Sequence, residues 1–287
     1  MVTGSDRGAP ADSHSAVSDA VTLHVRCYPE TGGLQTLTGW PSAHREAVTG
    51  VSDAMRTLAS EIETRTSFDR VYWRVEPMTP VDLSTGPGLE DGTDHTDTED
   101  VDPVTAMTDR FYRHLEHRET LTGTGCHLLL AWRPFDSNLG YGTTPSAYRR
   151  VGRRAGDAVT VANIGATEMW DTRAVTVNIA IHEVLHTFLS PAAARTVVGV
   201  GCDHSLGTVR ELEDGVREVS PMATAYAGAG TEGTDNDTRF SGTGCGHHAD
   251  FYRHDGVEGV HTWEHTTKMS EGTLEAASQY VEDTFGE

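Results

Sequence analysis

The stretch 175–191, VTVNIAIHEVLHTFLSP, places two histidines and a glutamate at H-E-x-x-H spacing within an apolar run. Residues four apart lie on one face of a helix, so the rings of His182 and His186 can both reach a single ion. Glu183 lies on the adjacent edge, within reach of a water molecule beside that ion. The apolar residues of the stretch face the other way and pack into a core. The sequence therefore predicts a largely buried helix that presents a metal site.

Zinc is the metal that this spacing predicts, and a catalytic zinc site has three protein ligands and one position for water. Glu183 would act as general base, taking a proton from the water that attacks a peptide carbonyl. This predicts a zinc-dependent endopeptidase acting on a peptide or protein substrate. One alternative is a metal-binding module without catalysis, against which the intact Glu183 argues because a structural site needs no base. Another is that the motif arose by chance in a chain with 15 histidines.

The block 157–228 resembles the zincin superfamily of metallopeptidases and is most similar to its metzincin branch. In that branch the motif continues as H-E-x-x-H-x-x-G-x-x-H, and a methionine turn lies downstream beneath the metal. In this chain His204 matches the third histidine in role, and Met222 in SPMAT matches the turn methionine. The segment DAVTVANIG resembles the edge strand along which metzincins align extended substrate. The resemblance implies an α+β zinc peptidase whose metal is held by three histidines.

The chain departs from the metzincin pattern in its spacing. Leu189 replaces the family glycine that makes a sharp turn, so Ser190-Pro191 would have to end the helix instead. His204 comes some twelve residues later than the family spacing, which requires an insertion that loops out and returns. Tyr226, a candidate oxyanion donor, stands four residues after Met222, whereas some metzincins place a tyrosine two residues after.

Other side chains compete with His204 for the third ligand position. Glu211 or Glu213 lies at a distance compatible with the thermolysin-like branch of the zincins, in which a glutamate completes the site. The SPMAT segment favours His204, because a methionine turn is hard to explain in the glutamate branch. The remaining candidates are Asp203, His247 and His248.

Acidic residues outnumber basic ones by 43 to 22, the formal net charge is -21, and Lys268 is the only lysine. Heavy acidity with so little lysine resembles the proteins of salt-in halophilic archaea, in which salt screens the self-repulsion. Such a surface has no basic stripe to neutralise phosphates, so nucleic acid is not an expected partner. The acidic segment 86–103 makes calcium conceivable as a second metal, although the segment lacks the EF-hand pattern.

Hydrophobic periodicity predicts alternating strands and helices before the motif. The predicted strands are 20–29, 68–78, 126–135 and 157–165, and the predicted helices are 41–66, 104–119, the motif helix and 266–285. Asp171 or Thr172 is the expected cap of the motif helix. After Pro191 the helical signal is weak, and 226–246 is typical of a loop. We predict an α+β fold in which a twisted mixed sheet packs on helices, with an irregular C-terminal half. Residues 1–20 are expected to be a disordered tail and 21–287 a single domain.

Four widely spaced cysteines are compatible with two disulfides or with free buried thiols: Cys27, Cys126, Cys202 and Cys245. A bond between Cys202 and Cys245 would tether the irregular segment near the metal. Neither a signal peptide nor a membrane span is recognisable, so the location is extracellular if a signal has been removed and otherwise cytoplasmic. Several polar or aromatic residues are predicted at the surface rather than at the site: Asn178, His254, His261, Trp263 and His265.

Overall fold

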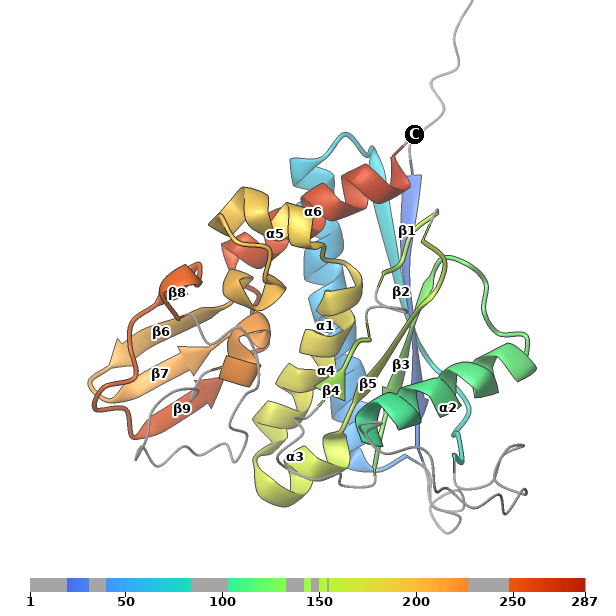
Figure 1. Cartoon of the computed structure of the whole chain (residues 1–287), viewed down its shortest axis with the longest axis horizontal. Coiled ribbons are helices and arrows are strands. Elements are labelled where there is room, and N and C mark those ends of the chain that lie inside the picture. The colour runs from blue at the N-terminus through green and yellow to red at the C-terminus, as the bar shows by residue number, and fades with distance from the viewer. Residues whose placement is uncertain are drawn as a thin grey trace, which may run out of the picture.

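Helices pack around two mixed β-sheets in this protein (Figure 1). The computed structural model describes residues 20–30, 40–83, 103–132, 142–145, 150–153, 155–226 and 248–286. The predicted combination of helices with mixed sheets is confirmed. The expected N-terminal tail and the acidic segment 86–103, considered for calcium, lie almost entirely outside the described residues.

Among the described residues, the first sheet has five strands in the order β2-β1-β3-β5-β4. The first four run parallel, and β4 runs antiparallel to β5. The strands are β1 (Ala20–Pro29), β2 (Arg70–Pro77), β3 (Gly125–Leu130), β4 (Gly142–Thr143) and β5 (Ala158–Ala162). Every residue of β3 and β5 is buried, as expected of parallel strands covered on both faces. β3, predicted as a strand from its apolar run, is the central strand of this sheet.

One edge of this sheet is β4, not β5. The prediction that 157–165 forms the edge strand is wrong, because β5 lies between β3 and β4. Gly142 and Thr143 pair with Ala162 and Val161 along that edge. Two residues in a stretch rich in glycine and threonine show no alternation of apolar and polar positions, so the sequence predicted no strand here.

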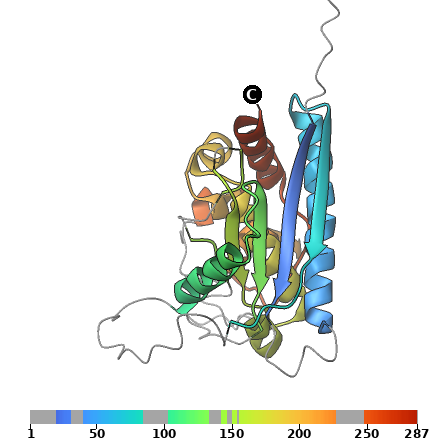
Figure 2. The same ribbon diagram turned by 90° about the vertical axis from the view of Figure 1, so that its right-hand side faces the viewer.

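Helices cover the first sheet on both faces (Figure 2). On one face lie α1 (Ser42–Arg65), α4 (Arg173–Thr187) and α6 (Glu271–Phe285), which share the largest core, and on the other lies α2 (Pro103–His117). The short α3 (Ile164–Trp170) precedes α4. α1 and α4 approach closely at Gly50, where a Cβ would overlap the Val177 side chain. The motif helix α4 thus packs against both α1 and the first sheet.

The C-terminal half holds a second sheet in the order β8-β6-β7-β9 beside α4 (Figure 1). Its strands are β6 (Thr208–Glu213), β7 (Val216–Val219), β8 (Arg253–His254) and β9 (Thr262–His265). The prediction of an irregular C-terminal half is wrong for these segments. Strands of two to six residues are too short for their alternation to be recognised, and they form because they bury one face together against the rest of the chain.

Short helices complete this half of the protein. They are α5 (Pro191–Val198) and the 3-10 turns η4 (Asp203–Leu206), η5 (Pro221–Tyr226) and η6 (His248–Asp250). The sequence showed only a weak helical signal after Pro191. α5 forms there because Ser190 caps it and proline suits the first helical turn.

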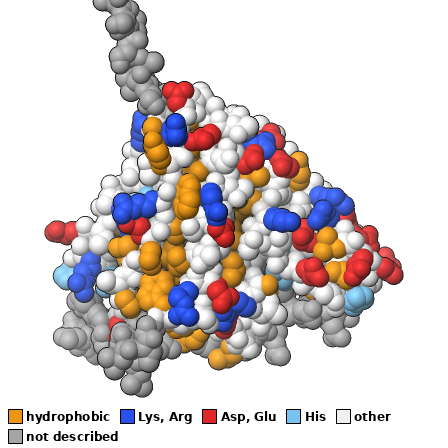
Figure 3. Space-filling model, turned by 180° about the vertical axis from the view of Figure 1, so that it is seen from behind, with side chains coloured by type: hydrophobic (Ala, Val, Ile, Leu, Met, Phe, Trp, Pro, Cys, Tyr) orange, Lys and Arg blue, Asp and Glu red, His pale blue; other side chains and the backbone are white. Residues whose placement is uncertain are grey.

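Charged side chains of both signs are interspersed on the face seen from behind (Figure 3). On that face the basic side chains lie among acidic ones and do not form a separate basic stripe. Within the described ranges, no helix combines the length and the apolar character needed to cross a bilayer.

Candidate metal centre

Helix α4 brings the two motif histidines together on one face. Thr172, one of the two expected caps, accepts a hydrogen bond from the Val175 amide at 3.4 Å and begins the helix. The ring centroids of His182 and His186 lie 4.5 Å apart, and their Nε2 atoms are 2.9 Å apart. Both rings are buried. The four-residue spacing therefore becomes a pair of converging ring nitrogens.

The connection after α4 differs from the one that the sequence suggested. Ser190-Pro191 was expected to end the motif helix, but α4 already ends at Thr187, and Ser190 caps α5 instead. Leu189, which stands where metzincins have glycine, is buried in the core. Gly199 ends α5 in the left-handed conformation, with φ 81°, and lets the chain reverse. The insertion expected before His204 is thus this short helix and its turn.

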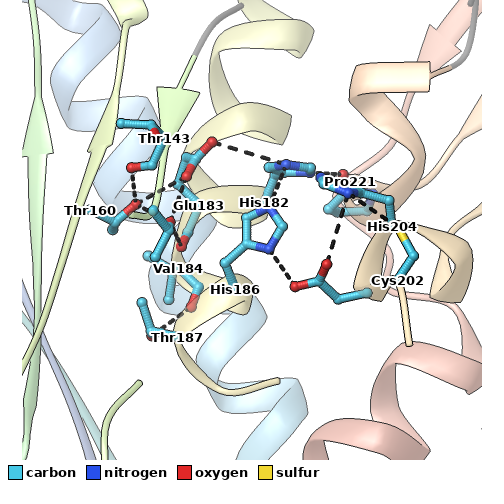
Figure 4. Close-up of polar contacts among 12 residues, drawn as sticks. Thr143, Thr160, His182, Glu183, Val184, His186, Thr187, Cys202, His204 and Pro221 are labelled. Carbon is cyan, nitrogen blue, oxygen red and sulfur yellow. Dashed lines mark hydrogen bonds and ion pairs between the residues drawn. The ribbon is translucent and has the colours of Figure 1, made fainter. Parts of the chain in front are cut away.

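His204, in η4, returns to the two motif histidines (Figure 4). Its ring centroid lies 5.0 Å from that of His182 and 4.7 Å from that of His186. The ring stacks on His182, with 26° between the planes, and meets His186 edge to face at 80°. Three imidazoles from two segments of the chain therefore form one cluster, which we call the metal centre.

The outer nitrogens of the motif histidines are bonded to the protein. His182 Nδ1 lies 2.6 Å from the carbonyl oxygen of Pro221, and His186 Nδ1 lies 2.7 Å from Asp203 Oδ2. A carbonyl and a carboxylate accept hydrogen bonds, so each Nδ1 carries the proton and donates it. Each Nε2 of the neutral rings is then an acceptor, and the two acceptors face one another. Partners of this kind commonly orient histidines that bind metals.

The donor set fits a divalent cation such as zinc. One ligand atom from each of His182, His186 and His204 lies within 4.8 Å of the others. Zinc binds imidazole nitrogen at about 2.0–2.1 Å, which places two nitrogens of a tetrahedral site about 3.3 Å apart. A positive charge between the two Nε2 acceptors, either a metal ion or an additional proton, would offset the repulsion between their lone pairs. A third nitrogen close by is what a metal ion requires and a proton does not.

A second group, formed by Cys202, Asp203 and His204, is a poorer candidate. Cys202 is disulfide-bonded, so its sulfur offers no thiolate to a metal. Its expected partner, Cys245, lies outside the described residues. Cys27 and Cys126 are buried free thiols, and burial raises the pKa of Cys126 to about 12. Both arrangements that the spacing allowed therefore occur: Cys202 is in a disulfide, and Cys27 and Cys126 are free buried thiols.

Glu183 lies between the metal centre and the edge of the first sheet (Figure 4). Its Oε2 lies 2.7 Å from the Thr144 hydroxyl and 3.0 Å from the Thr160 hydroxyl. Its Oε1 lies 4.0 Å from His182 Nε2. Gly142 in β4 packs directly on the carboxylate, where a Cβ would overlap it. The carboxylate is placed beside the ring nitrogens rather than among them, which suits a base better than a ligand.

Met222 is fully buried in η5, next to the residue that accepts the His182 proton. The turn packs tightly on η4, because a Cβ on Gly207 would overlap Ala223. The segment SPMAT therefore supports the metal centre through the Pro221 carbonyl and by packing. The side chain of Tyr226 lies outside the described residues, so its expected part as an oxyanion donor stays a prediction.

The rival ligands lie elsewhere or have other partners. Glu211 and Glu213 are exposed on β6, and Glu211 Oε1 pairs with Arg217 Nη1 at 3.0 Å. Asp203 accepts from His186, and its other oxygen lies 3.8 Å from His204 Nδ1. Asp203 therefore holds the His186 ring from outside by a hydrogen bond and places its other oxygen near His204. The side chains of the last two candidates lie outside the described residues: His247 and His248.

Some residues that were expected at the surface are buried. Asn178 is buried on α4, and its amide donates to the carbonyl oxygens of Val219 at 3.3 Å and Thr266 at 2.6 Å. It joins the motif helix to the second sheet, so the prediction that Asn178 lies at the surface is wrong. Trp263 is also buried, in the core of the second sheet, whereas His261 is exposed. Burial lowers the pKa of His265 to about 4.

Sequence reasoning missed the residues that support Glu183 and the His186 ring from outside. Thr160 carried a recognisable signal, because it is a polar residue in the middle of a strand that is otherwise apolar. Thr144 and Gly142 carried none, since nothing local shows that their segment pairs with β5. The role of Asp203 was also missed, because it was considered only as a ligand.

Protein-family models and curated proteins were compared with this chain, and no family model and no curated protein matches it. The function must therefore be argued from the site.

Proposed function

We propose that this protein is a zinc-dependent peptidase, with His182, His186 and His204 as metal ligands and Glu183 as general base. The observation that carries the proposal is the convergence of three imidazoles with a glutamate carboxylate set beside them, 4.0 Å from the nearest ring nitrogen. A structural metal site has no use for that carboxylate. The acidic, lysine-poor composition supports the further proposal that the enzyme works in concentrated salt.

A bound zinc ion would supply Lewis acidity, which lowers the pKa of water toward about 7 and polarises a carbonyl. The residues of this chain supply the remaining functions. Pro221 and Asp203 hold the motif histidines in the tautomer that directs Nε2 to the metal. Glu183 would accept the proton from the attacking water through Oε1 and deliver it to the departing amine nitrogen.

A metal-binding module without catalysis is the second candidate, and the burial of the site favours it. The side chains of His182 and Glu183 are each 3% exposed, and that of His204 is 17% exposed. A metal held there by buried ligands would stabilise the fold without needing a substrate.

Glu183→Gln separates the two candidates. The amide keeps the shape of the side chain but cannot take up a proton at neutral pH. The purified variant should keep about one zinc ion per chain while its rate of hydrolysis of casein or a quenched peptide falls by about 10²- to 10⁴-fold. The assay is run in molar salt, with Glu264→Gln, an exposed glutamate on β9, as the matched control.

Equal hydrolysis by wild type and Glu183→Gln would refute the role of Glu183 as the base. Zinc bound by the wild type without cleavage of either substrate would favour the module. Absence of zinc from the wild type, purified without chelator and supplied with the metal, would refute both candidates.

A further inference from the structure

The two threonine hydroxyls beside Glu183 come from neighbouring strands of the first sheet. Thr144 directly follows the edge strand β4, and Thr160 lies in the middle of β5. We propose that Thr144 and Thr160 are positioning residues, which hold Oε2 of Glu183 so that Oε1 is presented to the metal centre. This inference rests on the proposed function, because it gives a role to the orientation of the general base.

The distances order the hydrogen bonds in this group. The two hydroxyl oxygens lie 2.5 Å apart, so a proton must lie between them. Oε2 of Glu183 lies closer to Thr144, at 2.7 Å, than to Thr160, at 3.0 Å. The arrangement that satisfies both short contacts has Thr160 donating to Thr144 and Thr144 donating to Oε2. Each bond in such a chain polarises and strengthens the next.

The surroundings keep these hydrogen-bonded side chains rigid. Thr160 is fully buried, so water does not compete for its hydroxyl. Gly142 lies against the same carboxylate and leaves room for it only because it has no Cβ. With Oε2 engaged by a hydroxyl on the sheet side, the carboxylate cannot turn without losing that bond. Oε1 is thereby kept on the side of His182.

Removal of the hydroxyls should affect the rate and not the binding of substrate. Neither threonine belongs to the three-histidine cluster. Besides the base, they contact each other, and Thr160 also lies 3.0 Å from the carbonyl oxygen of Thr143. Misplacement of a catalytic group by about 1 Å can cost about 10²-fold in rate. We expect Thr144→Val to lower kcat by about 10- to 100-fold with KM unchanged, and Thr160→Val to lower it less, because Thr160 acts through Thr144. Thr144→Ser should restore most of the rate, since serine keeps the hydroxyl.

The experiment compares these variants with Thr187→Val, all loaded with zinc in molar salt. Thr187 is a buried threonine on the same helix as Glu183, and its hydroxyl donates to the Val184 carbonyl at 2.7 Å (Figure 4). Zinc content and the melting temperature are measured beside kcat and KM. A crystal structure of the zinc-loaded Thr144→Val, Thr160→Val double variant shows whether the carboxylate has turned.

Supporting results are a lower kcat for Thr144→Val with zinc retained, rescue by Thr144→Ser, and a turned carboxylate in the double variant. The proposal is overturned if kcat is unchanged in an active enzyme, if zinc is lost, or if the carboxylate keeps its place. A wild type that binds zinc and cleaves nothing refutes the peptidase instead. In that case the crystal structure alone decides whether the hydroxyls position the carboxylate.

Discussion

A single buried histidine, His127, and the histidines of the metal centre lie on opposite faces of the first sheet, and their ring nitrogens have different partners. On the α2 face, His127 Nδ1 lies 3.1 Å from the Tyr28 hydroxyl and its Nε2 lies 3.4 Å from Asp157 Oδ1. We call these three residues the His127 network. On the α4 face, in the metal centre, His182 and His186 turn their Nε2 atoms toward each other at 2.9 Å.

The His127 network is complete as protein alone, because the hydroxyl can donate or accept and the carboxylate accepts. The metal centre brings two acceptors together, and a positive charge between them would stabilise this arrangement. Both groups lie in apolar segments, so hydrophobic patterning does not distinguish them. The partners of the ring nitrogens do, and they separate a histidine that supports the core from one that can bind a metal.

Replacement of a metal-centre histidine has the largest expected effect on this contrast. His186→Ala removes one of three ligands, so the zinc content should fall from about one ion per chain to nearly zero after gel filtration. His127→Phe should keep the metal and lower stability by about 1–3 kcal/mol, because Asp157 and Tyr28 lose a partner. Zinc analysis and urea unfolding in molar salt measure both. Zinc retained by His186→Ala, or lost from His127→Phe, would show that the two groups do not differ in this way.

Asp203→Asn should have a smaller effect on the same centre. The amide still reaches His186 but accepts its proton less strongly, and it leaves the His204 side without a charge. Loss of such a partner typically lowers metal affinity by about 10- to 100-fold. A titration against a competing chelator measures the change, with the exposed Asp69→Asn as control. An affinity equal to that of the control would mean that Asp203 does not support the ligands.

Asp157→Asn tests the other side of the comparison and has the smallest expected effect. Burial raises the pKa of Asp157, but hydrogen bonds from His127 and from the amides of Gly123 and Gly125 outweigh it and leave the pKa below its ordinary value. The carboxylate therefore stabilises the fold above the unfolded pKa, about 3.9, and this contribution is lost as the pH falls through the folded pKa.

We expect Asp157→Asn to cost about 1–2 kcal/mol at pH 7, with the difference from wild type shrinking below about pH 4. Urea unfolding at a series of pH values measures it, and the zinc content should not change. A difference that is independent of pH would mean that the charge of Asp157 does not contribute.

Parts of the fold were readable from local sequence. The strands before the motif, helix α1 and the motif helix carry long, regular patterns, and the structure has them with small differences in bounds. β4 and the second sheet were missed, because strands of two to six residues form through their partners and not through their own periodicity. The interior position of β5 was also missed, because an apolar strand does not indicate which strands lie on either side of it.

The candidate site divides in the same way. His182, Glu183 and His186 could be identified because three residues within one helical turn have a fixed relation. His204 was one of several candidates, since its distance from the pair depends on how α5 and Gly199 reverse the chain. The support from Thr144 and Thr160 was not foreseen, because it arises where two strands meet under the helix.

The amino-acid order alone determined the apolar helix, the direction of its two imidazoles and the acidic character of the chain, since each depends on neighbours within a few residues or on composition. The folded chain decided which distant nitrogen joins the pair, which histidines stay with protein partners, and which oxygen of the glutamate faces the centre. Those outcomes depend on contacts between segments far apart in the chain, and contact distances of a few ångströms are set by packing rather than by spacing in sequence.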